Sequence, residues 1–233
     1  TLCDDRLSNQ RSLDHVMPLI CGNFSELPSI EIEETFWRVN TYHWRNYDES
    51  PIGKMINPID VRAFIWGDVF RTLDLPDNAE FNQYIATEYQ AKRIQTYRCY
   101  KDTIEILKEW KNQYPLILVT NGNSIMQRKK VEVSGLTPLL DDIFIAQEVR
   151  SSKPEPKIFQ LALQSVQFPP EKVLMVGDNP EKDIQGAKDV GIQTAWIRRN
   201  DEFDRFPDPN PDFYVKTLDE LKEILQNADV QSQ

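Results

Sequence analysis

Residues 172–183, KVLMVGDNPEKD, join the pattern of a buried strand to an acidic turn and the start of a helix. After the lysine, the first part of this stretch is apolar on both faces, as in a parallel strand that helices cover on both sides. Gly177 permits a tight turn, Asn179 is a good N-cap, and Pro180 suits the first helical position. Asp178 is therefore predicted to lie at the carboxyl end of a strand, where open α/β sheets bind their ligands.

The acidic turn contains a second carboxylate, Asp183, five residues after Asp178. Two carboxylates ~4 Å apart repel each other by about 4 kcal/mol at an effective dielectric constant of 20. A divalent cation removes this cost, and carboxylates together with water suit Mg²⁺ best. We therefore predict a Mg²⁺ site with Asp178 and Asp183 as its metal ligands. The alternative is that both aspartates only add favourable negative charge to the N-terminus of a helix.

Composition limits the classes of partner. The chain has 233 residues, a net charge of -10 and a pI near 4.8, and such an acidic protein is a poor partner for nucleic acid or an anionic membrane. No apolar run approaches the ~20 residues that span a bilayer. Three cysteines without metal-ligand spacing, and no signal-peptide pattern, predict a cytoplasmic protein with reduced thiols. Composition leaves both a monomer and a homodimer open.

The spacing of apolar residues changes near residue 98. Residues 5–97 show helical spacing without a convincing strand, which predicts an all-helical segment. Residues 98–233 alternate strand and helix patterns, which predicts a parallel sheet with helices on both faces. The predicted fold class is therefore α/β, with the all-helical segment inserted into it.

Individual elements follow from the same patterns. The expected strands are 116–119, 142–146, 172–176, 194–197 and 213–216, and the expected helices of this part include 124–134, 156–166, 180–190 and 217–225. Capping-box pairs at Asp77/Glu80 and Asp102/Glu105 predict the starts of two further helices. The acidic, proline-containing stretch 200–211 is expected to form a surface loop.

Two other strand-to-helix junctions also carry polar groups. Thr120 offers a hydroxyl at the end of a strand, and the backbone N–H groups of Asn121 and Gly122 precede a helix, so the three form a predicted anion site. Lys153 lies just before the next helix, where an isolated lysine is more often a solvated surface residue. A hydroxyl, an ammonium group and metal-binding carboxylates at one sheet edge are the groups that a phosphoryl group needs.

The order and spacing of these residues resemble the haloacid dehalogenase-like (HAD) superfamily of phosphohydrolases. The second motif of that family is a strand that ends in Thr or Ser, as at Thr120, and the third is a lysine before a helix, as at Lys153. The fourth motif is Gly-Asp followed by Asp five residues later, as Gly177, Asp178 and Asp183 are.

The resemblance covers residues 100–200 closely and implies a Rossmann-like core at residues 98–233. Segment 5–97 resembles the helical cap that the family inserts just after its first motif. Thr120, Asn121 and Gly122, with Gln127 and Arg128 downstream, resemble the subgroup that holds N-acylneuraminate and flavin-precursor phosphatases.

The chain departs from the family pattern at its beginning. The first motif of the family is a buried strand ending in Asp-x-Asp-x-Thr-Leu, whose first Asp is the nucleophile and whose second is the general acid/base. Residues 1–4, TLCD, resemble only the end of this motif. We therefore expect both aspartates and their strand to lie before residue 1, so that the printed chain lacks the nucleophile and is inactive by itself.

The resemblance implies a mechanism for the complete protein. The first Asp attacks phosphorus to give an aspartyl-phosphate, and the second protonates the leaving alkoxide and then activates water. The resemblance also implies a role for each site residue. Phosphate is bound by Thr120, Asn121, Gly122 and Lys153, of which Lys153 and Thr120 are also catalytic. Mg²⁺ is bound by Asp178, and Asp183 supports the metal site. The implied substrate is a small phosphorylated metabolite.

Two rival functions stay open at this point. A haloacid dehalogenase shares the fold but attacks carbon and needs no Mg²⁺, so the metal-suited pair Asp178 and Asp183 disfavours it. The second rival function is that of a non-catalytic protein that binds phosphate or a partner. This function would explain a chain without the two catalytic aspartates. The sequence does not identify the phosphomonoester.

Overall fold

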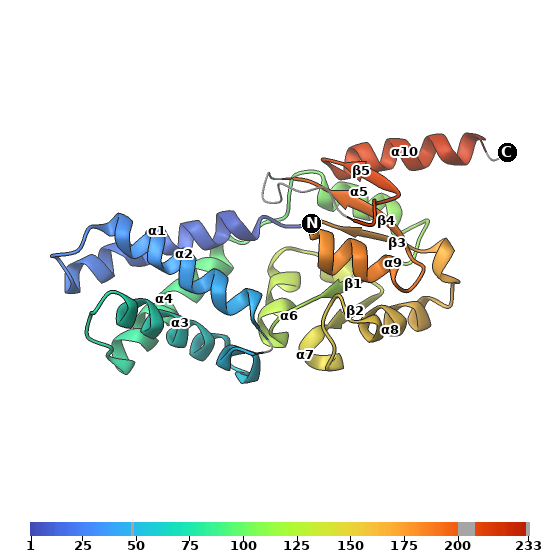
Figure 1. Ribbon diagram of the computed structural model, residues 1–233. Helices are drawn as coiled ribbons and strands as arrows, with labels where there is room; N and C mark the ends of the chain where they lie inside the picture. Colours follow the sequence, from blue (N-terminus) through green and yellow to red (C-terminus); the bar gives the residue numbers. More distant parts are fainter. Residues whose placement is uncertain (48, 200–207, 232–233) are drawn as a thin grey trace. The chain divides into compact units, whose positions relative to one another are not determined.

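The structure is a computed structural model that describes residues 1–47, 49–199 and 208–231 (Figure 1). These residues form two compact units: a helical unit, Asp4–Arg98, and an α/β unit, Thr1–Cys3 with Cys99–Gln233. Residues 200–207 of the expected surface loop lie outside the described residues. Across the described ranges, no helix is long and apolar enough to cross a membrane.

The helical unit bears out the predicted all-helical segment. Its elements are α1 (Asp5–Asn23), α2 (Ser29–Arg45), a 3-10 helix at Pro51–Lys54, α3 (Pro58–Thr72) and α4 (Ala79–Thr96). Helix α4 packs against α1 and α3, and α2 packs against α3. Trp66 is fully buried, with its ring stacked on Phe36 at 4.7 Å and on Phe70 at 5.7 Å between centroids. Stacked rings of this size supply much of the apolar area that a small helical core needs.

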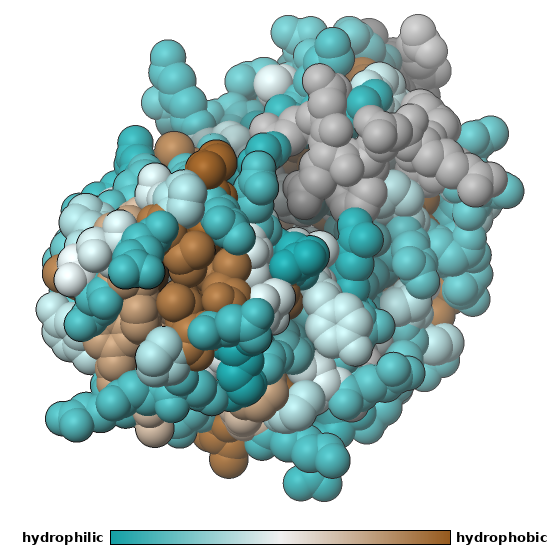
Figure 2. Space-filling view, turned by 60° about the vertical axis from the view of Figure 1, so that its left-hand side comes forward, coloured by the Kyte–Doolittle hydropathy of each residue, from teal (hydrophilic) through white to brown (hydrophobic). Residues whose placement is uncertain are grey.

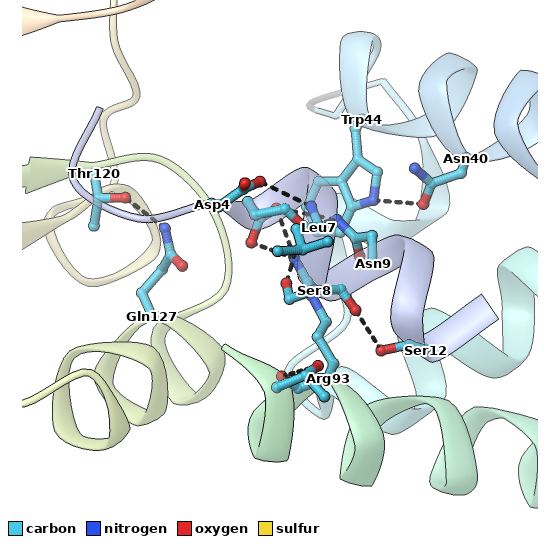
Figure 3. A network of polar contacts seen from close by, with 12 residues as sticks. Asp4, Leu7, Ser8, Asn9, Ser12, Asn40, Trp44, Arg93, Thr120 and Gln127 are labelled. Atoms are coloured by element: carbon cyan, nitrogen blue, oxygen red, sulfur yellow. Dashed lines mark hydrogen bonds and ion pairs between the residues drawn. The ribbon is translucent and has the colours of Figure 1, made fainter. Parts of the chain in front are cut away.

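Short polar side chains cap the N-termini of three of these helices. The Asp4 carboxylate accepts a hydrogen bond of 2.8 Å from the backbone N–H of Leu7 and so caps α1 (Figure 3). Asn57 and Asn78 cap α3 and α4 in the same way. Each cap satisfies a backbone donor that the first turn of a helix leaves free.

The face that Figure 2 shows is mostly hydrophilic, with an apolar patch on its left-hand side. The large apolar side chains that the helical unit exposes are Leu7, Ile30, Tyr42, Ile56 and Tyr84.

The α/β unit alternates strands and helices. Its strands are β1 (Ile117–Thr120), β2 (Asp142–Ile145), β3 (Leu174–Gly177), β4 (Gln193–Ile197) and β5 (Phe213–Val215). Its α-helices are α5 (Thr103–Trp110), α6 (Ser124–Val133), α7 (Ala146–Val149), α8 (Pro156–Val166), α9 (Gly186–Lys188) and α10 (Leu218–Gln231). Short 3-10 helices lie at Thr137–Leu139 and Pro170–Lys172, and a π-helix at Pro180–Gln185.

All strand pairs are parallel, as predicted, but the described strands form two sheets instead of one. Strand β1 pairs with β2, and β3 pairs with β4, which in turn pairs with β5. Apolar side chains of β1 and β3 are only half-buried, whereas Ala195, Trp196 and Ile197 of β4 are buried. Among the described residues, β1 and β3 therefore each present an edge that no strand covers.

Two apolar clusters show that side chains of the strands point to both faces. Leu118 of β1 and Val176 of β3 join the cluster that contains Trp110 of α5 and Leu221 of α10. Their neighbours Val119 and Met175 join the other cluster, which α8 and α9 help to form. Since successive strand residues point to opposite faces, this division confirms the predicted α/β fold with helices on both sides.

The predicted helix after Asp178 is interrupted. Asn179 caps it and Pro180 begins it, as predicted, but residues Pro180–Gln185 form a π-helix before the short α9. Strand β3 begins at Leu174, two residues later than predicted, because Pro170–Lys172 form a 3-10 helix.

Candidate active site

Asp183 is the most enclosed polar residue at the end of β3. Its Oδ2 accepts hydrogen bonds from the backbone N–H groups of Asp178 at 3.1 Å and Asn179 at 2.9 Å. The residue is only 4% exposed. Backbone donors compensate part of the cost of burying this carboxylate and hold the turn that presents Asp178.

Gly177 allows Asp183 to approach the backbone so closely. A Cβ atom added at Gly177 would overlap the Asp183 side chain. The glycine is therefore required by the close approach of the carboxylate.

Gly177→Ala is expected to lower the free energy of unfolding by about 1–3 kcal/mol, because the added methyl group must displace Asp183 from its two backbone donors. Gly22→Ala is a matched control, since Gly22 lies in α1 and an added Cβ there meets nothing within 4 Å. Denaturant unfolding with circular dichroism measures both variants. Equal stability of Gly177→Ala and the parent would show that this close approach does not constrain the turn.

Lys153 is bound to Asp183 and is not a solvated surface residue. Its Nζ donates a hydrogen bond of 2.6 Å to Asp183 Oδ1, and the two side chains are 12% and 6% exposed. The surface alternative for this lysine is therefore wrong. An ion pair shielded from water in this way keeps both charges fixed in position.

Asn121 connects the end of β1 to the Lys153 segment. The Asn121 side chain donates to the carbonyl oxygen of Lys153 and accepts from its backbone N–H, both at 2.8 Å. Gly122 follows with a φ of +111°, a conformation that glycine adopts without strain. This turn leads to Asn123, whose side chain caps α6 by accepting from the N–H of Met126.

The Thr120 hydroxyl lies beside a glutamine that the sequence did not identify as a site residue. Gln127 of α6 points its amide at Thr120 and donates to the hydroxyl oxygen (Figure 3). The same amide donates to the carbonyl oxygen of Asn121 at 2.8 Å. Two sequence signals pointed to Gln127: its position one turn into the helix after Thr120, and its place in the pattern that resembles the phosphatase subgroup.

Asp178 is the accessible carboxylate of this cluster. Its side chain is 43% exposed, and its Oδ1 accepts hydrogen bonds from the Thr1 ammonium group, at 2.7 Å, and from the Thr1 hydroxyl. Burial alone raises the pKa of Asp178, but the charge and hydrogen bonds of Thr1, with the charge of Lys153, lower the pKa below its ordinary value. Trp196 of β4 donates to the Asp178 carbonyl oxygen at 2.9 Å and fixes the backbone there.

The strand ends offer few carboxylates to a metal ion. Among the described residues, no group of three or more His, Cys, Asp or Glu side chains is arranged to hold an ion. Both oxygens of Asp183 are engaged with protein donors, whereas Asp178 is half-exposed. One available carboxylate fits Mg²⁺, which keeps several waters and uses only one or two carboxylates with substrate phosphate. Mg²⁺ binding by Asp178 and Asp183 stays a prediction.

The predicted residues form a continuous chain of contacts. Asn121 bonds to Lys153, Lys153 to Asp183, and Asp183 to the backbone of Asp178. Thr120 joins this chain through Gln127, which also contacts Asn121. Polar groups from the ends of β1 and β3 and from the segment before α8 are thus linked through side chains.

Comparisons with known proteins identify a family and relatives for this chain. The family model described as haloacid dehalogenase-like hydrolase matches residues 31–191. N-acylneuraminate-9-phosphatase from Rattus norvegicus is 30% identical over 172 residues, which cover 73% of this chain and 69% of that protein. Phosphoserine phosphatase from Thermus thermophilus is 38% identical over 106 residues, which cover 46% of this chain and 42% of that protein.

One solved structure shows the same fold. The HAD-hydrolase YfnB from Bacillus subtilis, crystallised with bound magnesium, superposes with a TM-score of 0.74 at 23% identity. The superposition covers 97% of this chain and 94% of that one.

Proposed function

Because this chain belongs to the haloacid dehalogenase-like hydrolase family, we propose that it hydrolyses a small phosphomonoester with the help of Mg²⁺. The observation that carries the proposal is the chain of contacts from Asn121 through Lys153 to Asp183 and the backbone of Asp178. It gathers anion-binding and cation-binding groups at the strand ends, and the two sequence relatives above are phosphatases. A phosphoryl group needs both kinds of group, because negative charge is spread over its oxygens as it is transferred.

In this proposal, the first strand end binds phosphate oxygens. The Thr120 hydroxyl and the backbone N–H groups of Asn121 and Gly122 donate to them. Lys153 places an ammonium group beside them and offsets the charge of phosphate and nucleophile. Asp183 keeps that ammonium group in position through the 2.6 Å hydrogen bond.

Asp178 is the residue that would hold Mg²⁺. An aspartate carboxylate is ionised at neutral pH, which a metal ligand requires. When bound, Mg²⁺ polarises the phosphoryl oxygens and compensates their charge. In this proposal Asp183 supports the Mg²⁺ site by holding the turn that carries Asp178 and by orienting Lys153.

The nucleophile and the general acid/base are proposed to lie on a strand before Thr1. A strand parallel to β1 and β3 would cover both free edges and bury their half-exposed apolar side chains. The Thr1 hydroxyl donates to Asp178, which supports an end of this proposed strand near the carboxyl edge of β3. Its two aspartates would then act as nucleophile and acid/base beside Lys153.

We predict that the coding sequence immediately upstream specifies an apolar strand ending in Asp-x-Asp plus one residue before Thr1. The physical reason is that, in the part of the chain that the structure describes, β1 and β3 carry free edges and half-exposed apolar side chains, whereas a parallel sheet is normally buried on both faces. Sequencing the transcript to its 5′ end tests this. A start codon directly before Thr1 would contradict the placement of the nucleophile.

The helical unit is proposed to be a cap that closes over the site and selects the substrate. A small soluble metabolite in the cytoplasm suits the acidic surface better than nucleic acid or a membrane does. N-acylneuraminate 9-phosphate and phosphoserine are natural first candidates, since relatives are named for these substrates.

The reaction class is tested on protein expressed from the complete coding sequence. We expect inorganic phosphate release from at least one member of a panel of phosphomonoesters, stopped by a chelator and restored by Mg²⁺. The two rival functions give different results. Halide release from a 2-chloro acid that survives chelation would favour a dehalogenase, and binding of phosphate without any release would favour a non-catalytic protein.

A further inference from the structure

Two cysteines face each other where the chain passes between its two units. The helical unit begins at Asp4 and ends at Arg98, so Cys3 and Cys99 are the α/β-unit residues directly outside it. The two cysteines form an antiparallel bridge. Backbone hydrogen bonds of 3.1 Å flank the pair on each side, from Tyr100 N to Leu2 O and from Asp4 N to Arg98 O.

The pattern of these hydrogen bonds determines how close the cysteines are. Cys3 and Cys99 occupy a non-hydrogen-bonded position, where paired Cα atoms lie about 4.5 Å apart and side chains approach most closely. A disulfide needs a Cα separation of about 4.4–6.8 Å. The two Sγ atoms are in contact at 2.8 Å, and both residues are partly exposed. Backbone pairing and side-chain contact both suit a disulfide between these residues.

We propose that Cys3 and Cys99 are a reversible redox pair, which a low-molecular-weight disulfide such as oxidised glutathione converts into an intramolecular disulfide. The Cys3 thiolate attacks the glutathione disulfide and releases one glutathione thiolate, which leaves a mixed disulfide. The Cys99 thiol then loses its proton, attacks Cys3 Sγ and releases the second glutathione. Two cysteine thiols are oxidised while one external disulfide is reduced to two thiols.

The order of attack follows from the surroundings of Cys99. Its hydrogen bond with Cys3 and then its burial raise the pKa of the Cys99 thiol above the ordinary range. Cys99 Sγ also donates to the Ser134 carbonyl oxygen at 3.9 Å, which holds the Cys99 thiol in place, so we assign Cys99 as the resolving thiol and Cys3 as the attacking one. The mixed disulfide on Cys3 removes the largest cause of this raised pKa, so the second step becomes easier once the first has occurred.

The third cysteine is a control supplied by the chain itself. Cys21 lies in α1, inside the helical unit, and packs against the core of that unit. It belongs to a different apolar cluster from Cys3 and Cys99.

The disulfide would tie together both connections between the units. It would close one loop that contains the entire helical unit, and such a loop restrains the chain more strongly as its length increases. If the helical unit moves during turnover, as the proposed function holds, the connections must change their backbone angles. Oxidation is then expected to change kcat and KM together, because hinge restraint affects both closure and product release.

The test is thiol counting and peptide mapping of the complete protein in glutathione buffers of increasing oxidation. We expect two thiols to disappear together, one linked peptide pair that contains Cys3 and Cys99, and full reversal by dithiothreitol. Cys21→Ser should form the same link and Cys3→Ser should not. Persistent mixed disulfides on Cys3 without a link, or a link that involves Cys21, would overturn the proposal.

Activity is measured separately on the same samples. A changed kcat and KM in the oxidised parent, with an unchanged Cys3→Ser variant, supports restraint of the connections. An unchanged oxidised parent overturns the restraint, although the link exists. A protein without phosphatase activity even when reduced would instead count against the proposed function, and the thiol measurement would still decide whether the redox pair exists.

Discussion

Lys153→Ala is expected to lower kcat/KM for a phosphomonoester by about 30-fold to several thousand-fold. The ammonium group pairs with Asp183 at 2.6 Å, and both side chains are largely shielded from water. Removing one partner leaves a buried charge uncompensated, which costs roughly 2–5 kcal/mol. Each ~1.4 kcal/mol corresponds to a factor of ten in rate. Steady-state kinetics on the complete protein measure the loss, and circular dichroism checks the fold.

Two matched variants show whether the loss of kcat/KM in Lys153→Ala comes from the position of the lysine or only from the loss of its charge. Lys188→Ala removes a lysine that also pairs with an aspartate, Asp212, but in a more exposed setting, so kcat/KM should be unchanged. Lys153→Arg should restore only part of the activity, because the wide planar guanidinium does not replace a compact ammonium group. A Lys153→Ala variant within threefold of the parent would show that the strand ends do not form one site.

Asp178→Asn is expected to abolish turnover without changing the fold. The amide keeps the shape of the carboxylate but removes the negative charge that would hold Mg²⁺, and electrostatic losses of this kind reach on the order of 100- to 1,000-fold or more. The side chain is 43% exposed, so the substitution creates no buried unpaired group. Phosphate release at saturating Mg²⁺ measures the effect.

Asp189→Asn is the matched control for Asp178→Asn. Asp189 accepts a hydrogen bond from Gln185 at an exposed position of the same β3-to-β4 connection. Its replacement should leave phosphate release unchanged. An Asp178→Asn enzyme that retains more than about a tenth of parental kcat would exclude this carboxylate as the metal ligand.

The strand ends of the site could be predicted because local signals agree there. Residues 174–176 are apolar on both faces, and Gly177, Asn179 and Pro180 then supply a turn, a cap and a helix start. The strand, the turn, the cap and the helix start are each determined by residues close together in the sequence, so no tertiary information was needed to predict them. The π-helix was not predictable, because Ile184 donates back to the Asn179 carbonyl oxygen while Asp183 is held by Lys153 from another segment.

Helix caps show where local patterns fail. Asp77 was predicted to cap α4, but Asn78 is the N-cap, and the Asp77 carboxylate accepts from Asn82 at 2.6 Å. Asp102 precedes α5 as predicted, yet its carboxylate accepts from the backbone N–H of Leu218 at 2.8 Å and from Arg199 at 3.0 Å. Both partners lie about a hundred residues away in sequence, so a capping-box pattern alone could not predict this use of the side chain.

Contacts between the motifs could not be predicted from the sequence either. The paired hydrogen bonds between Asn121 and Lys153, and the contact of Gln127 with Thr120, depend on how two strand ends and two helix starts are arranged in space. Residue types predicted which groups are polar. Tertiary packing determined which of them touch, and in particular that Asp183 binds Lys153 and the backbone of Asp178.

The most direct measurement of the central claim is the binding of orthovanadate, a phosphate analogue, by calorimetry with and without Mg²⁺. The samples are the complete parent protein, Lys153→Ala, Asp178→Asn and the control Lys188→Ala. One shared site predicts that binding requires Mg²⁺ in the parent, weakens at least tenfold in Lys153→Ala and Asp178→Asn, and is unchanged in Lys188→Ala. Binding within threefold of the parent in all four samples, or binding that is indifferent to Mg²⁺, would contradict a single phosphate site at these strand ends.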